Sequence, residues 1–409
     1  MSYFNGKISK GFFAIYSGRM VLRASGALMG LFLPIFLYEL FDFNIKLVFI
    51  YYLVGYISYA FFIAWGVQYL NKIGLRRSLR ISLIWGSLFY FVFYLIQKLS
   101  NNLEWTLDFS NKINILLLFT IIVLTLQRIM YWTPLHTDLA KFTDKKNRAK
   151  QLSLLEATSI AIGAVMPLLA GWILLYYNYD VLFFMAVIIY LIAFIPFMKL
   201  PRTREKFSWT YAQTWKKLFS PKRRNVVFAY IGDGAESVVG IIIWPIFIWE
   251  LLNGDYFQVG MLSSLIVVVT VFLQLLVGKF ADNKNKKNML KYGSCFYAVG
   301  WVVKIFIATA FHIFIVSAYH NLAKIFTRVP FDALTYEKAA DQGHYVDEYT
   351  VIHEIAIQIG KILMIIFALI LVSFLSIEWT FILAAFASLT MNFLAKDNIL
   401  DSVQNKTTL

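Results

Sequence analysis

The sequence predicts an all-α integral membrane protein with about twelve transmembrane helices in two pseudo-symmetric six-helix bundles. Its 409 residues are 60% hydrophobic and only 15% charged, which is more apolar surface than a soluble core of this size buries. The apolar runs are about 20 to 25 residues long, as an α-helix needs to cross a hydrocarbon layer of about 30 Å. A pattern in the first half recurs in the second half, which indicates a duplicated chain.

The first expected span covers Ala24 to Phe41, and its apolar run lacks the small-residue cleavage site of a signal peptide. The other expected spans are 45–70, 79–97, 113–133, 152–177, 181–200, 226–251, 257–280, 289–310, 313–329, 351–374 and 379–394.

Basic residues predict the orientation, because loops rich in Lys and Arg are retained in the cytoplasm. With the N-terminus inside, basic side chains gather in the inner loops, whereas the outer loops carry few charges, most of them acidic. We therefore expect a multi-pass protein of the cell membrane with both termini in the cytoplasm. The net charge of +15 is a topology signal, and anionic lipid is its expected partner instead of nucleic acid.

The longest inner loop divides the chain into an N-terminal bundle (1–200), a basic linker (201–224) and a C-terminal bundle (225–409). Within the linker, Phe207, Tyr211, Trp215 and Leu218 recur at helical spacing. This spacing favours a helix in the membrane interface, with its aromatic side chains in lipid and its lysines on headgroups. The alternative is a solvated linker with incidental aromatic residues.

Two short charged turns carry the repeat, and each lies between two long apolar runs. Asn71 in the first turn and Asp282 in the second lie 211 residues apart. At the same spacing Pro34 matches Pro245, and Glu39 likewise matches Glu250 five residues farther on.

The second turn resembles the signature of the major facilitator superfamily, which reads roughly G-x-x-x-D-R-x-G-R-R between the second and third helices of each half. It keeps Gly278, Asp282, Lys286 and Lys287, but it has Asn285 where the family has its second glycine.

The first turn keeps Gly74 and Arg76 of the same signature, but Asn71 replaces the acid. The resemblance covers nearly the whole chain, and it implies a twelve-helix transporter whose two halves rock apart in alternation. It also implies a gating role for both turns, in which the acid caps a neighbouring helix and pairs with an arginine. Asn71 has the capping group but not the charge.

Intramembrane charges mark the candidate cavity, because each is costly unless it faces a partner or a wet cavity. They lie in the first, fourth, seventh and tenth spans, which the resemblance assigns to the central cavity. These residues are Arg19, Arg23, Arg128, Asp233, Glu236, His320, Lys324 and Arg328. Within each span a spacing of three or four residues places the side chains on one helix face.

The repeat also relates charges of the two halves to each other. Arg23 falls level with Asp233 and Glu236, so an ion pair between the halves is expected. A second match, of 126–134 with 322–330, places Arg128 and Lys324 at similar depth. Such halves are related by an axis along the membrane normal, and the substrate path lies between them.

Three roles stay open for these charges. By helix rise, Glu236 lies about 21 Å from Glu250 at the outer end, and Lys324 lies about 12 Å from Asp332 at the inner end. The charges therefore crowd the cytoplasmic half. They act as a gate or structural pairs, they bind substrate or protons, or they snorkel to the membrane surface, with Arg19 the foremost candidate for the last role.

Glycines predict where the helices pack closely or bend. Gly26 and Gly30 in the first span, and the glycines 232, 234 and 240 in the seventh, predict close packing or kinks, although glycine is common in membrane helices anyway.

Glu354, beside His353 in the eleventh span, joins the candidate cavity, because histidine next to a carboxylate relays protons. A structural pair with a neighbouring basic residue is the alternative. The sequence alone gives no basis for assigning a function to Lys304.

Enzyme signatures are absent from the sequence, and no cofactor or metal is expected. The single cysteine, Cys295, excludes an internal disulfide and a multi-cysteine metal site, and the five histidines show no paired metal spacing. No G-x-x-x-x-G-K-[ST] loop occurs, which favours transport driven by a gradient over transport driven by ATP.

These observations predict a monomeric secondary transporter of a small solute, coupled to protons through Asp233, Glu236 and Glu354. The basic groups of the candidate cavity favour an anionic substrate such as a carboxylate or an organic phosphate. The alternatives are efflux of a drug-like amphiphile or a lipid, or a membrane assembly component without transport. Aromatic residues that favour an amphiphile are Tyr131, Trp132, Trp244 and Trp249.

Overall fold

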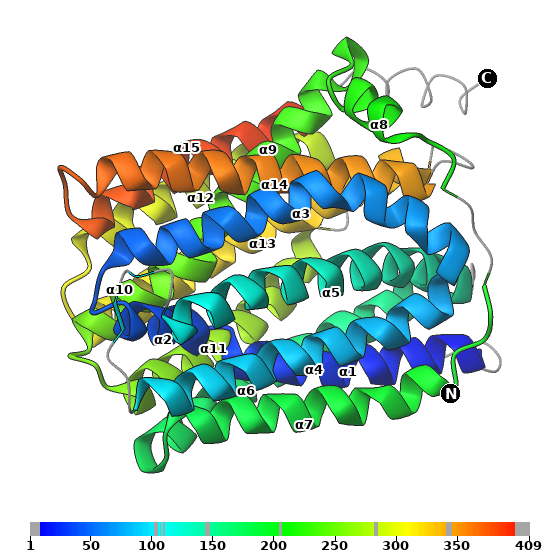
Figure 1. Cartoon of the computed structure of the whole chain (residues 1–409). Coiled ribbons are helices and arrows are strands. Elements are labelled where there is room, and N and C mark those ends of the chain that lie inside the picture. The colour runs from blue at the N-terminus through cyan, green and yellow to red at the C-terminus, as the bar shows by residue number, and fades with distance from the viewer. Residues whose placement is uncertain are drawn as a thin grey trace, which may run out of the picture. The chain divides into compact units, whose positions relative to one another are not determined.

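The computed structural model describes residues 9–101, 105, 106, 108, 111–143, 148–203, 207–281, 285–340 and 346–396. Within these ranges the chain consists of helices and their connecting turns, as Figure 1 shows. The all-α prediction is therefore confirmed for the described part of the chain.

The chain packs as two compact units. Unit 1 comprises Met1–Ser208 and Ile248–Val267, and unit 2 comprises Trp209–Phe247 and Val268–Leu409. Unit 1 thus includes the end of one helix and the start of the next from the second half of the chain. The bundle limits at 200 and 225 stay a prediction.

Long helices form the body of unit 1. In chain order they are α1 (Lys10–Met29), α2 (Phe32–Leu40), α3 (Ile45–Ile73), α4 (Leu75–Ser100), α5 (Lys112–Phe142), α6 (Arg148–Tyr176) and α7 (Tyr179–Met198). Helix α1 packs against α6 and α7, α4 packs against α5 and α7, and α3 packs against α5. Their core includes the buried side chains of Phe12, Ile15, Leu79, Leu135 and Phe197.

The first span begins earlier than its apolar run predicted. Helix α1 starts at Lys10, where the Ser9 hydroxyl accepts the backbone N–H of Phe12 at 3.0 Å, and not at Ala24. The reason is that a helix continues through polar residues once it is capped and packed on one face. Helices α1 and α2 meet at a bend of 40° at the break after Met29, so the predicted kink near Gly30 is confirmed.

Helices of the second half follow a linker helix, α8 (Tyr211–Leu218). They are α9 (Arg224–Val238), α10 (Trp244–Leu251), α11 (Tyr256–Ala281), α12 (Lys286–Val303), α13 (Ala310–Ala340), α14 (Val346–Leu371) and α15 (Thr380–Thr390). In unit 2, α9 packs against α14 and α15, and α12 packs against α13 and α15.

The described part of the chain has nine helices long and apolar enough to cross a membrane, or up to ten if the bent pair α1 and α2 is one span. Neither α12 nor α13 is among these candidate spans. The chain is thus a multi-pass integral membrane protein, and the count of twelve stays a prediction.

Glycines decide how closely α9 approaches its neighbours. A Cβ atom built at Gly234 lies 2.0 Å from the carbonyl oxygen of Ile357, and one built at Gly360 lies 2.0 Å from that of Ile231. The backbones of α9 and α14 therefore touch at a crossing where neither helix has room for a methyl group. Gly26 differs, since no described atom lies within 4 Å of its built Cβ, so the close packing predicted there is wrong.

This difference gives a matched pair of substitutions. Gly360→Ala should lower the melting temperature of the detergent-purified protein by several degrees, because overpacking against a backbone carbonyl costs about 1–3 kcal/mol. Gly26→Ala should leave it unchanged or raise it slightly, because alanine is the better helix former. Equal melting temperatures for the two variants would contradict the α9–α14 crossing.

Candidate functional site

Two buried carboxylates on α9 form the centre of the candidate site. Asp233 and Glu236 are three residues apart, which places them on one helix face, and their exposed fractions are 7% and 1%. On either side of Asp233, Gly232 meets Ala387 and Thr390 at the end of α15, and Gly234 meets α14. These glycines let α9 fit between α14 and α15, and both carboxylates then lie within reach of Arg328 on α13.

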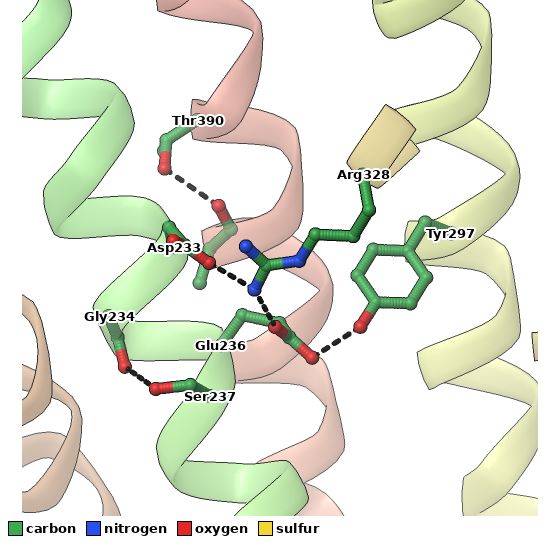
Figure 2. Close-up of polar contacts among 8 residues, drawn as sticks. Asp233, Gly234, Glu236, Ser237, Tyr297, Arg328 and Thr390 are labelled. Atoms are coloured by element: carbon green, nitrogen blue, oxygen red, sulfur yellow. Dashed lines mark hydrogen bonds and ion pairs between the residues drawn. The ribbon is translucent and has the colours of Figure 1, made fainter. Parts of the chain in front are cut away.

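Arg328 of α13 contacts both carboxylates, as Figure 2 shows. Its Nη2 atom contacts Asp233 Oδ1 and lies 3.6 Å from Glu236 Oε2. The hydroxyl of Tyr297 donates a hydrogen bond of 2.5 Å to Glu236 Oε1. Buried charges are tolerated only when they are paired and hydrogen-bonded, and these four side chains supply those contacts to one another.

A π-helical turn follows Glu236 directly. The turn spans Val239–Ile243, and the N–H of Trp244 bonds to the carbonyl of Val239, five residues back. Pro245 has no N–H, and its ring crowds the carbonyl four residues earlier, so the wider turn accommodates it. Single π turns in helices frequently occur at functional sites.

Lys304 is the principal site residue that sequence reasoning missed. Its side chain is only 3% exposed, and its ammonium lies 3.7 Å from the ring centroid of Trp244 and 4.1 Å from that of Trp301. Two aromatic faces therefore stabilise this cation in a buried environment. The available signal was the spacing of Trp301 and Lys304, which places them on one helix face.

A second group of basic side chains borders this lysine. Lys324, half-buried on α13, interacts electrostatically with Lys304 and with His320. The His320 ring lies against Tyr297 and Trp301, with centroids 4.6 and 4.5 Å away. The acid that interacts with Lys304 is Glu236, which also pairs with Arg328.

Glu354 lies at the edge of the same unit 2 site. It adjoins His353 on α14, whose ring meets the Tyr230 ring edge-on at 4.4 Å. His353 interacts electrostatically with Glu354, Asp233 and Arg328. Five predicted site residues, Asp233, Glu236, Lys324, Arg328 and Glu354, therefore belong to one neighbourhood of unit 2.

The other two predicted site residues, Arg23 and Arg128, belong to unit 1. Arg23 is exposed and interacts electrostatically with Glu156. Asp233 and Glu236 already have Arg328 as their partner, and the predicted pair between Arg23 and these acids stays a prediction.

Arg128 lies among tyrosines. Its guanidinium is 5.8 and 5.9 Å from the ring centroids of Tyr56 and Tyr59, and the Tyr52 and Tyr190 hydroxyls are within its electrostatic range. Among the described residues Arg128 makes no ion pair with a carboxylate. This cation is therefore stabilised by aromatic faces and phenol dipoles, without a fixed counter-charge.

The first motif turn is well defined. Gly74 separates α3 from α4 with φ of +82°, which glycine adopts without strain. Arg76 donates to the carbonyl of Leu200 at 3.3 Å, and Arg80 donates to the carbonyls of Phe197 and Met198. These arginines bind the last carbonyls of α7, where positive charge complements the helix dipole.

Asn71 replaces the acid of the family signature and binds the linker. Its side-chain nitrogen donates to the carbonyl of Phe207, and its side-chain oxygen accepts from the N–H of Phe207, both at 2.9 Å. Only an amide supplies both partners, because an ionised carboxylate has no donor. Phe207 is buried and precedes α8, so its predicted place on the lipid-facing helix is wrong.

The second motif turn is partly described. Gly278 lies within α11, and Lys286 and Lys287 begin α12, whereas Asp282 lies outside the described residues. Asn285, which replaces a family glycine, caps α12 by accepting the N–H of Lys287 at 2.9 Å.

Tyrosines also bind the repeated carboxylates Glu39 and Glu250, within unit 1. The Tyr256 hydroxyl donates to Glu39, and the Tyr38 hydroxyl donates to Glu250. The Trp249 ring packs against both tyrosine rings, at 6.2 and 6.1 Å. Matching positions of the repeat therefore share one chemistry, which the sequence did not reveal.

A comparison with protein-family models gives one match, described as the Major Facilitator Superfamily, over residues 15–319. A search of curated proteins finds no match. The matched range holds Asp233, Glu236 and Lys304, whereas Lys324 and Arg328 lie beyond its end. Since the match covers more than half of the sequence, the chain belongs to the Major Facilitator Superfamily of membrane transporters.

Proposed function

We propose that the protein is a secondary active transporter that moves a small anionic solute together with protons by alternating access. The observation that carries the proposal is the buried pair Asp233 and Glu236, shared by one arginine within a transporter fold. A charge inside a membrane protein is retained when it serves a function, because its burial is otherwise costly. The protein acts as a transporter and not as an enzyme.

Charge balance supports the coupling of protons to an anion. The single positive charge of Arg328 balances only one of the two carboxylates. Lys304 interacts electrostatically with the other acid, Glu236, and with Lys324. A proton on Glu236 removes the negative charge that balances these lysines, and an anion restores it. Proton and anion then favour each other's binding, and this mutual effect is thermodynamically reciprocal.

The basic side chains support an anion over a cation. Arg128 in unit 1 and Lys304 in unit 2 both lack an ion pair with a carboxylate among the described residues, and both rest on aromatic rings. Such cations are available to a carboxylate or phosphate of the substrate.

Basic turns support an orientation with both termini in the cytoplasm of a cell-membrane protein. Arg76 and Arg80 gather at the turn between α3 and α4, and the five basic residues from Lys216 to Arg224 lie from the end of α8 to the first residue of α9. Under the positive-inside rule these segments lie on the cytoplasmic side. The two motif turns then act there as gates.

A second candidate is transport of an aromatic amphiphile. The tyrosines around Arg128 favour it, because their aromatic rings can pack against an apolar or aromatic part of a substrate next to a charged group. A thermal-shift panel of small carboxylates, phosphates, sugars and cationic drugs separates the two candidates. A ligand at 100 times its Kd raises the stability by about 2.7 kcal/mol.

The acid pair gives the first functional prediction. Asp233→Asn or Glu236→Gln should abolish pH-driven accumulation of the panel's best anion in proteoliposomes and leave its exchange across the membrane, because exchange needs no net proton movement. Asp42→Asn is the control, since Asp42 is exposed at φ of 51°, which asparagine also adopts. Unchanged pH-driven uptake in both acid variants would refute proton coupling through this pair.

The cations give the second functional prediction. Arg128→Gln and Lys324→Gln should each raise the Kd of that anion at least about thirtyfold, because losing a charge partner of a bound anion costs about 2 kcal/mol or more. Isothermal titration of the purified protein measures the Kd, with exposed Lys112→Gln as the charge-matched control. Unchanged Kd values in both cavity variants would assign these residues to a gate instead.

Asn71 gives the third functional prediction. Asn71→Ala removes both bonds to Phe207 and should speed tryptic cleavage after Arg202, whereas Asn71→Asp should have an intermediate effect because it keeps only the acceptor. Gel analysis of a digestion time course measures the rate, with Asn101→Ala at the end of α4 as control. An Asn71→Ala rate equal to that of the unmodified protein would show that the amide does not hold the linker.

A further inference from the structure

Helix α8 has two different faces. Its N-terminus is fixed by a capping box between Thr210 and Gln213, so this short helix is well formed. Thr214 and Leu218 are buried, and the helix packs against α14. Leu218 therefore faces protein.

The other face carries an aromatic stripe. Tyr211, Trp215 and Phe219 recur every four residues, and neighbouring rings lie 6.2 Å apart. The stripe ends at Phe219, which is 70% exposed. An aromatic stripe on a helix next to a membrane span is typical of the zone between headgroups and acyl chains.

Positive charge surrounds the stripe without any acidic residue. From residue 207 to residue 232 the sequence contains no Asp or Glu. The basic residues of this segment are Lys216, Lys217, Lys222, Arg223 and Arg224. The segment therefore attracts anions, and its charge is not balanced locally.

Two of these cations converge on one ring. The Lys217 ammonium lies 4.7 Å and the Arg223 guanidinium 5.3 Å from the ring centroid of Trp209, whose side chain is 7% exposed. Among the described residues neither cation pairs with a carboxylate, and Nη1 of Arg223 is buried without a hydrogen-bond partner. Like charges repel, so an anion between them would stabilise the arrangement.

We propose that α8 and the turn after it bind an anionic phospholipid, whose headgroup phosphate lies between Lys217 and Arg223. Arginine and lysine are the usual phosphate partners, and the unpartnered Nη1 of Arg223 supplies a donor. The acyl chains lie along Trp215 and Phe219. A membrane phospholipid fits better than free phosphate, because the candidate span Pro221–Leu251 begins at this turn and the exposed phenylalanine adjoins it.

Native mass spectrometry of the full-length protein tests the proposal. After incubation with equal amounts of phosphatidylglycerol and phosphatidylcholine, the unmodified protein should retain phosphatidylglycerol preferentially. Lys217→Gln/Arg223→Gln should reduce this retention at least about fivefold, as expected for losing even one basic contact to an anionic lipid. The control Lys46→Gln/Lys112→Gln removes two exposed charges from the starts of α3 and α5 and should retain the lipid fully.

A second measurement does not depend on the charge variants. A nitroxide on Phe219→Cys in a Cys295→Ser background should be more accessible to oxygen than to a polar nickel reagent in mixed phosphatidylcholine and phosphatidylglycerol vesicles. Higher accessibility to nickel would overturn the placement of Phe219 in lipid. Equal retention in both double variants, or an equal thermal shift with inorganic phosphate and with phosphatidylglycerol, would overturn the lipid site.

Discussion

The cost of charge in an apolar environment governs this structure more than any other constraint. Transfer of an unpaired ion from water into a membrane interior is strongly unfavourable, so each retained charge needs a partner close by. Arg328 meets this cost by pairing with Asp233 and Glu236. Lys304 meets it differently: its ammonium lies over two indole faces, and Glu236, the acid that interacts with it, is already paired with Arg328.

The difference between these two solutions matters for transport. A cation that is paired with a carboxylate already has a counter-charge, so an anionic substrate must displace that carboxylate before it binds the cation. A cation over aromatic rings keeps its electrostatic attraction for an incoming anion, because the rings supply only a quadrupole. Arg128 and Lys304 both have this second kind of environment, one in each unit.

Backbone packing is the condition for this arrangement of charges. Asp233 and Glu236 are buried because Gly232 and Gly234 bring α9 against α15 and α14, where larger residues would hold it away. The π turn after Glu236 then adapts the helix to Pro245. The sequence predicted close packing or kinks at these glycines, and at Gly232 and Gly234 the structure shows close packing, since a residue without a Cβ lets another helix backbone approach.

Helical spacing predicted what lies on one helix, and it could not predict what other helices bring. Asp233 with Glu236, and Lys324 with Arg328, were placed correctly on shared faces, because periodicity is a local property. Lys304 was missed because Trp244, one of its two ring partners, lies 60 residues away on another helix. The hydrogen bonds of Glu39 and Glu250 were missed for the same reason. The first span was predicted too short, since an apolar run marks the hydrocarbon layer and not the ends of the helix.

The two asparagines of the motif turns show how a departure from a family signature can carry its own physical logic. A carboxylate in such a turn acts through charge, so its strength depends on a cationic partner and on salt. Asn71, which replaces the acid, acts instead through backbone hydrogen bonds to both polar groups of Phe207. Asn285, which replaces a glycine, adds a hydrogen bond to the N-terminus of α12. An amide matched to a backbone N–H and C=O is specific for geometry and nearly independent of ionic strength. The first turn thereby exchanges an electrostatic contact for a fixed attachment of the linker, and the nearby positive charge of Arg76 and Arg80 is left to the carbonyls at the end of α7.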